Sequence, residues 1–128
     1  MHQEMTLIEA RTNIVFDAKK HKLQELFQEF GTDSTLVADA QKNSLYAILD
    51  KMDIHEEIVR FKSHLNNFEA HLTSPDGEKG KQLDFILQEL GRETNTIAAK
   101  CSDAVIGTHA INLKVAIEKA REQVQNIV

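Results

Sequence analysis

The sequence predicts an all-α protein, an antiparallel bundle of about five helices that includes long helical hairpins. Three observations support this fold class. Apolar residues fill 41% of the 128 positions, and they recur at spacings of three and four, the period of an amphipathic helix. One proline and five glycines are too few for the many turns of a β-sandwich. The length fits a single domain.

The first predicted helix covers residues 6–30, and Gly31 is expected to end it, since glycine commonly follows a helix C-terminus. Its apolar stripe comprises Leu7, Ile14, Val15, Ala18, Leu23, Leu26, Phe27 and Phe30. A loop at 32–35 with capping side chains leads into a second helix at 35–52. The apolar side of that helix comprises Leu36, Val37, Ala40, Leu45, Ile48, Leu49 and Met52. We assign residues 1–44 to an N-terminal helical segment.

The third predicted helix begins at Asp53, which can cap it, because Glu56 follows three residues later in a variant of the capping box. Its apolar residues alternate at spacings of four and three, a seam suited to a helical hairpin or a coiled coil. The seam comprises Ile54, Ile58, Phe61, Leu65, Phe68 and Leu72. The sequence Ser-Pro-Asp-Gly at 74–77 is the strongest turn signal, and it predicts that the next helix packs antiparallel to the third.

The fourth predicted helix covers residues 78–101, and the fifth covers 103–126 after a break at which Asp103 can cap. The fourth stripe comprises Leu83, Ile86, Leu87, Leu90, Ile97 and Ala98. The fifth comprises Ile106, Ala110, Leu113, Ile117, Ala120 and Val124. Phe85 belongs to the fourth predicted helix and lies to one side of the apolar stripe of that helix. Because Phe61, Phe68 and Phe85 occur at helical core spacing, we favour core packing over stacking on nucleobases for all three.

The charge balance argues against a free-standing electrostatic nucleic-acid binder, because 20 acidic and 15 basic residues give a net charge of −5. A single cysteine, Cys101, fits a reducing compartment. No apolar run approaches the roughly 20 residues of a membrane span, and the first residues lack the basic and apolar regions of a signal peptide. These features predict a cytoplasmic protein that does not bind membranes.

Two rows of polar side chains run beside the apolar faces of the third and fourth predicted helices. The row on the third helix comprises Glu57, Arg60, His64, Asn67 and His71. The row on the fourth comprises Lys81, Asp84, Gln88, Arg92 and Asn95, with Glu89, Glu93 and Lys100 on its flank. The rows are either a solvated flank and an interhelical hydrogen-bond network, or a surface for a ligand or partner. Carboxylates and a histidine suit a hard divalent cation, but the spacing matches no established metal motif.

The second half of the chain resembles a known family. The sequence GKQLDFILQEL at 80–90, followed by Arg92, Glu93, Asn95, Thr96 and Ile97, closely resembles the signature near the C-terminus of YicC/YloC-like endoribonucleases. The stretch DIHEEIVRFKSHL at 53–65 resembles the preceding motif, and residues 117–127 resemble the family's ending. The resemblance covers residues 45–128 in unbroken order, which we assign to a YicC-like C-terminal helical domain.

The resemblance implies a stress-associated, divalent-metal-dependent endoribonuclease of the bacterial cytoplasm that cuts single-stranded RNA and assembles as a homo-oligomer. The implied metal is manganese or magnesium. Family members are more than twice as long and carry a separate N-terminal half, so the resemblance also implies that half as a missing partner. We therefore expect the chain alone to be inactive or weakly active.

The resemblance and the two facing rows together give each polar residue a predicted role. We expect a catalytic group of His64, Glu57, Glu89 and Glu93, with His64 as general acid or base. Glu57, Glu89 and Glu93 are the predicted metal ligands. The predicted RNA phosphate-binding residues are Arg60, Lys81, Arg92 and Lys100. The predicted orienting polar residues are Asp84, Gln88, Asn95 and Thr96.

The chain departs from the family pattern at Gly91, where asparagine is usual, and at four further positions. Ala98 and Ala99 replace glycine and serine, Val105 replaces an acidic residue, and Thr108 stands where arginine is common. The alternative function is a non-catalytic oligomerisation or interaction bundle in which the polar rows form a structural network. The seam of the third helix and the length of the first favour this alternative.

Overall fold

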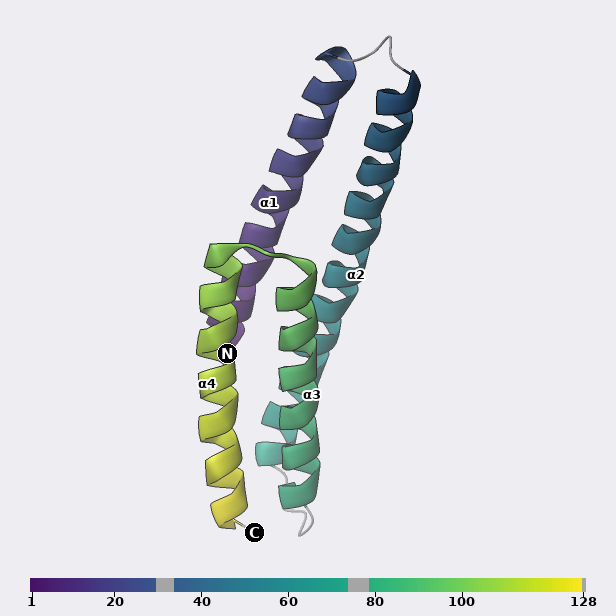
Figure 1. Cartoon of the computed structure of the whole chain (residues 1–128). Helices are drawn as coiled ribbons and strands as arrows, with labels where there is room; N and C mark the ends of the chain where they lie inside the picture. Colours follow the sequence, from purple (N-terminus) through teal and green to yellow (C-terminus); the bar gives the residue numbers. More distant parts are fainter. Residues whose placement is uncertain (30–33, 74–78, 128) are drawn as a thin grey trace.

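The computed structural model describes residues 1–29, 34–73 and 79–127, and within these ranges it contains four α-helices and no strand. The helices are α1 (His2–Glu29), α2 (Ser34–Leu72), α3 (Lys79–Lys100) and α4 (Ala104–Ile127). Consecutive helices run in opposite directions, and each packs against two others, so α1 contacts α2 and α4 while α3 contacts the same two (Figure 1). The predicted all-α class and the antiparallel packing are confirmed.

The prediction of five helices is wrong, because the second and third predicted segments form one continuous helix of 39 residues. No glycine or proline occurs between Ser34 and Leu72, so nothing in the chain breaks the backbone hydrogen-bond ladder at Asp53. Asp53 therefore lies inside α2 and does not cap it; its Oδ2 atom instead lies 3.4 Å from Lys100 Nζ on α3. The boundary between residues 44 and 45 falls within this helix.

Two other predicted boundaries differ from those in the structure, and two further ones fall on residues outside the described ranges. α1 begins at His2, four residues before the predicted start, and Ser34 and Thr35 of the predicted loop belong to the first turn of α2. The predicted stop at Gly31 and the predicted turn at 74–77 lie outside the described residues.

In the first half of α1 the predicted apolar stripe matches the core only at Val15, which packs against it partly buried, and the side chains of Leu26, Phe27 and Phe30 lie outside the described residues. Met5, Ile8, Thr12 and Phe16 are buried, whereas Leu7 and Ile14 of the predicted stripe are 41% and 57% exposed. Thr12 is compatible with the core because its hydroxyl donates a hydrogen bond to the carbonyl oxygen of Ile8 at 2.7 Å, which satisfies a polar group that would otherwise be costly to bury. The buried face of α1 therefore includes a position that hydrophobicity alone assigns to solvent.

The core lies between the first half of α1, the second half of α2, and the helices α3 and α4. The predicted seam of α2 is buried from Ile54 to Phe68, and only its last member, Leu72, is exposed. The stripes predicted for the fourth and fifth helices are likewise confirmed at their large apolar positions. The buried members are Leu83, Ile86, Leu87, Leu90, Ile97, Ile106, Ala110, Leu113, Ile117 and Val124.

The described part of the apolar side predicted for residues 35–52 does not join this core, and the side chains of Leu36, Val37 and Ala40 lie outside the described residues. Leu45, Ile48, Leu49 and Met52 are between 46% and 58% exposed. The hairpin of α1 and α2 extends beyond the end of the α3–α4 pair, so no other described helix covers this part of α2 (Figure 1). None of the described helices is both long enough and apolar enough to cross a bilayer.

Asp103 joins three elements at the α3–α4 junction, and its predicted role as the cap of α4 is confirmed. Its Oδ2 atom accepts a hydrogen bond from the backbone N–H of Ile106 at 3.2 Å. The Arg11 guanidinium of α1 donates to both carboxylate oxygens, at 2.9 and 3.1 Å. These hydrogen bonds from Arg11 lower the pKa of Asp103 from its ordinary value of 3.8, because they favour the charged form.

We expect the melting temperature to fall in the order wild type, Asp103→Asn, Asp103→Ala. Asparagine caps a helix about as well as aspartate, so Asp103→Asn loses only the ion pair. Asp103→Ala loses both the cap and the ion pair, which lowers the melting temperature by about 2–8 °C. The lowered pKa means that the carboxylate stabilises the fold above pH 3.8 and that this contribution is lost as the pH falls through the lowered value. Thermal denaturation followed by circular dichroism should therefore show wild type and Asp103→Asn converging only in acid; equal melting temperatures at pH 7 would refute the role of the ion pair.

Candidate functional site

Three ionisable side chains from α2 and α3 come together on one face of the bundle. Glu89 and Glu93 lie four residues apart on α3, so their side chains project from the same face one turn apart. His64 faces them from the adjacent α2. One ligand atom from each residue, a ring nitrogen or a carboxylate oxygen, lies within 4.8 Å of the other two. His64 and Glu89 are half-buried and Glu93 is buried, so solvent reaches the cluster through His64 and Glu89.

The carboxylate of Glu93 is the least satisfied group in this cluster. Glu93 is 4% exposed, and its Oε2 atom is buried without a hydrogen-bond partner among the described residues. Glu89 is better satisfied, because Arg92 Nη2 donates to its Oε1 at 2.7 Å. Burying a carboxylate oxygen without a partner is costly, so the cluster has an unmet need for a positive charge or a donor.

The donor set fits a divalent cation. Ligands of one ion at 2.0–2.4 Å lie at most about 4.8 Å apart, which the three side chains satisfy. Carboxylate oxygens with one imidazole nitrogen suit Mn²⁺, and carboxylates also suit Mg²⁺. The orphaned oxygen of Glu93 is the atom that such an ion would satisfy.

Glu57 lies outside this cluster, so the predicted convergence of four residues holds for three. It precedes His64 by seven residues, about 10 Å along the helix. The Glu57 Oε1 atom lies 3.5 Å from Arg60 Nη1 and 4.0 Å from Lys100 Nζ. Glu93 lies opposite His64, and Lys100 follows Glu93 by seven residues on α3. Because α2 and α3 are antiparallel, the same step of seven residues leads back along α2 from His64 to Glu57. Lys100 therefore lies opposite Glu57.

The four predicted phosphate-binding residues occupy different environments. Arg92 has a 71% exposed side chain and contacts the cluster directly through Glu89. Arg60 pairs with Glu56 and Glu57, and Lys100 pairs with Asp53 and Glu57. Lys81 is exposed at the beginning of α3. Arg92 is therefore the one member of the set that joins the cluster.

Among the described residues, no hydrogen bond joins the predicted orienting residues to His64, Glu89 or Glu93. Asp84 Oδ1 accepts a hydrogen bond from Arg121 Nε of α4 at 3.3 Å, and its Oδ2 accepts one from Gln88 at 3.0 Å. Asn95 is exposed, and the Thr96 hydroxyl donates to the backbone carbonyl of Arg92 at 3.0 Å. For Asp84 the structure supports the interpretation as an interhelical network.

Sequence reasoning missed two residues, Arg121 and Phe85. Arg121 Nε donates a hydrogen bond to Asp84 Oδ1, which raises the pKa of Arg121 and links α4 to α3. Phe61 and Phe68 are buried as predicted, but Phe85 is 61% exposed, so its predicted core packing is wrong. The position of Phe85 beside its stripe was the available signal.

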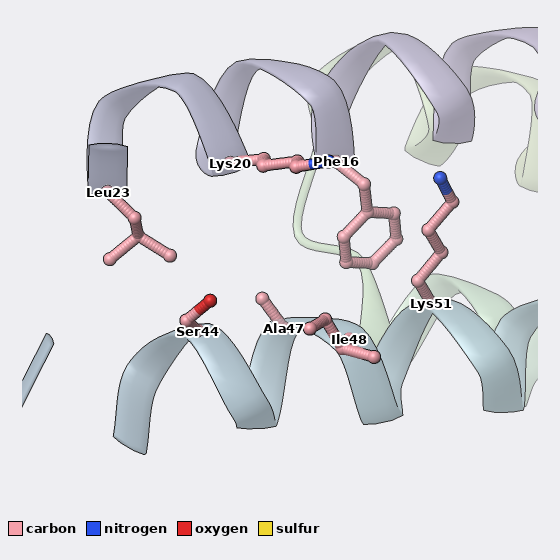
Figure 2. A pocket seen from close by; sticks show the side chains of 7 residues that line it. All are labelled: Phe16, Lys20, Leu23, Ser44, Ala47, Ile48 and Lys51. Atoms are coloured by element: carbon pink, nitrogen blue, oxygen red, sulfur yellow. The ribbon is translucent and has the colours of Figure 1, made fainter. Parts of the chain in front are cut away.

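A separate pocket of about 180 Å³ lies in the hairpin of α1 and α2, outside the cluster (Figure 2). Phe16 points from α1 toward α2 there, with Leu23, Ala47 and Ile48 also lining the hollow and Lys20 and Lys51 among its polar residues. None of the predicted site residues lines this pocket, and its lining contains no carboxylate or histidine.

None of the five departures from the family pattern belongs to the cluster of His64, Glu89 and Glu93. A Cβ atom at Gly91 would meet nothing within 4 Å, so a larger residue fits there equally well. Val105 is 42% exposed, and Ala99 and Thr108 are also exposed. These substitutions therefore leave the three residues of the cluster themselves unchanged.

The described residues form an antiparallel four-helix bundle that places an imidazole and two carboxylates on adjacent helices. The class of protein is therefore an all-α domain with a candidate metal site. Comparison with known families places it further. The family described as "Endoribonuclease YicC-like, C-terminal" matches residues 8–128, and the chain belongs to this family.

Two curated relatives agree with this assignment. The "Probable endoribonuclease YicC" of Clostridioides difficile (strain 630) is 39% identical over 123 residues, which cover 94% of this chain and 41% of that protein. The protein of the same name from Haemophilus influenzae is 37% identical over 106 residues, covering 81% of this chain and 36% of that protein. The chain therefore spans well under half the length of these relatives.

Proposed function

We propose that this chain is the C-terminal domain of a divalent-metal-dependent endoribonuclease that cuts single-stranded RNA. The observation that carries the proposal is the cluster of His64, Glu89 and Glu93, in which a buried carboxylate oxygen lacks a partner. The family and the two relatives bear endoribonuclease names, which supports RNA as the substrate. Cytoplasmic location and assembly with an N-terminal half belong to the same proposal.

His64, Glu89 and Glu93 would hold the cation, with manganese favoured over magnesium because one ligand is an imidazole. When bound, such an ion polarises a phosphoryl oxygen or lowers the pKa of a water molecule. A ring nitrogen that binds a metal cannot also carry a proton. The geometry thus supports His64 as a ligand, a different role from the general acid or base that the sequence predicted.

Arg92 orients one of these ligands and offers charge to the substrate. One of its N–H groups holds Glu89, and its exposed guanidinium retains further donors. Those donors can bind a phosphate beside the cluster, because guanidinium groups match phosphate geometry and remain charged at all physiological pH values. Arg60 and Lys100 act more weakly in this respect, since neighbouring carboxylates already neutralise them.

We expect cutting of a labelled single-stranded RNA by the purified chain to be weak and to require added Mn²⁺, and His64→Ala to lose at least about 10-fold in both cutting rate and manganese affinity. His55→Ala, an exposed histidine on the same helix, is the matched control and should behave as wild type. Gel analysis measures cutting, and titration calorimetry measures manganese binding. Unchanged manganese affinity in His64→Ala would contradict the ligand role and restore the role of proton carrier.

The non-catalytic alternative has one observation in its favour, the exposed apolar stripe of α2 formed by Leu45, Ile48, Leu49 and Met52. Four such residues at helical spacing suit association with a second copy of the chain. Sedimentation of the same samples distinguishes the outcomes. A stable oligomer that neither cuts RNA nor binds manganese would favour the scaffold, whereas cutting by the oligomer would show that both functions coexist.

A further inference from the structure

Phe85 is an exposed aromatic residue next to the cluster of His64, Glu89 and Glu93. It precedes Glu89 by four residues on α3, so it lies about 6 Å further along the same face of the helix. Its exposure of 61% leaves a flat apolar ring in contact with water. Phe16, Phe61 and Phe68, by contrast, are buried.

Phe85 lines an open pocket of about 420 Å³ between the end of α2 and the beginning of α3. The other lining residues are His71, Lys81, Gln82 and Ile86. They provide a cation, an imidazole and an amide, and no carboxylate. In a chain with a net charge of −5, such a lining is suited to an anionic ligand that also has a flat apolar face.

The pocket and the cluster lie one after the other along the same two helices, α2 and α3. His71 follows His64 by seven residues on α2, which places it on the same face about 10 Å further on. Because α2 and α3 are antiparallel (Figure 1), the step from His64 to His71 and the step from Glu89 to Phe85 point in the same direction. A strand whose phosphate lies at the cluster would thus reach the pocket with a neighbouring nucleotide.

We infer that the Phe85 pocket is a nucleotide-binding subsite, in which the base beside the scissile phosphodiester stacks on the Phe85 ring and Lys81 contacts an adjacent phosphate. Stacking on an aromatic side chain tolerates any base, because every base has a π face. The subsite therefore favours unpaired RNA, whose bases are free to stack, over duplex RNA. This inference rests on the proposed function and specifies how the same site holds its substrate.

We expect Phe85→Ala to weaken binding of a fluorescent single-stranded oligoadenylate by about 5- to 100-fold, and Phe85→Trp to bind at least as well as wild type. Fluorescence anisotropy with Ca²⁺ in place of Mn²⁺ measures the dissociation constants. The matched control is Ile111→Ala, which removes an apolar side chain that is 62% exposed on α4 and should leave binding unchanged. An abasic oligonucleotide of equal length should bind wild type and Phe85→Ala equally, because it has no base to stack.

The outcomes separate this inference from the proposed function. If the wild-type chain binds and cuts RNA while Phe85→Ala matches it, the subsite is wrong and the endoribonuclease proposal stands. Equal losses with oligoadenylate and the abasic strand would also overturn the subsite, since they would show that Phe85 does not contact a base. If the wild-type chain does not bind oligoadenylate, the subsite is wrong, whether or not the isolated chain cuts RNA.

Discussion

Glu93→Gln should lower manganese-dependent RNA cutting by at least about 100-fold while making the metal-free protein more stable by about 1–3 kcal/mol. Activity falls because an amide is a poor substitute for a charged ligand at a site of three donors. Stability rises because the buried, unpartnered oxygen of Glu93 no longer belongs to a charged group, and burying an unpaired charge is costly. A purely structural carboxylate would give the opposite change in stability.

Urea denaturation with and without Mn²⁺ tests both parts of this prediction. A ligand present at about 100 times its dissociation constant stabilises the native state by about 2.7 kcal/mol, and wild type should gain this amount where Glu93→Gln does not. Glu122→Gln, on the exposed side of α4, is the control and should gain as much as wild type. If Glu93→Gln destabilises the metal-free protein, then Glu93 has a partner in solution and the metal-site argument loses its main support.

Local signals in the sequence predicted some elements of the fold well. The stripe from Leu83 to Ile97 and the cap at Asp103 depend on residues within one or two turns, and both are confirmed. The cap at Asp53 had an equally good local signal and is wrong. A capping side chain is compatible with a helix interior when no glycine or proline interrupts the backbone, so such a signal permits a helix start without requiring one.

Burial could not be predicted from periodicity alone. Spacing identifies an apolar face on a helix but not whether another helix covers it. Leu49 and Phe61 both have helical apolar spacing, yet Leu49 is 46% exposed and Phe61 is fully buried, because the α1–α2 hairpin extends beyond the end of the α3–α4 pair (Figure 1). Thr12 shows the converse, a polar residue that the fold buries by bonding it to the backbone of its own helix.

The candidate site was predictable in its residue types but not in its grouping. Glu57 and His64 lie on the same strip of α2, and no property of that helix indicates which of them faces Glu93. The relative register of α2 and α3 decides this, and it depends on how the buried side chains of the two helices interdigitate. That register places His64 opposite Glu89 and Glu93 and Lys100 opposite Glu57.

Phe61→Ala should lower the free energy of unfolding by about 3–5 kcal/mol, the largest stability effect that we expect from a single substitution. The Phe61 ring is fully buried in the core, so its removal loses apolar burial and leaves a cavity that packed helices cannot close. Domains of this size have a total stability of about 5–15 kcal/mol, so the loss is a large share of the total. Urea denaturation followed by circular dichroism gives the measurement.

Phe85→Ala is the matched control, since it makes the same chemical change at a position that is 61% exposed. It should alter the free energy of unfolding by no more than about 0.5 kcal/mol. A loss as large as that of Phe61→Ala would mean that Phe85 is covered in solution, by a second copy of the chain or by another region. A small loss would show that the ring contributes little to the fold, so that any defect of Phe85→Ala in RNA binding reflects contact with the ligand.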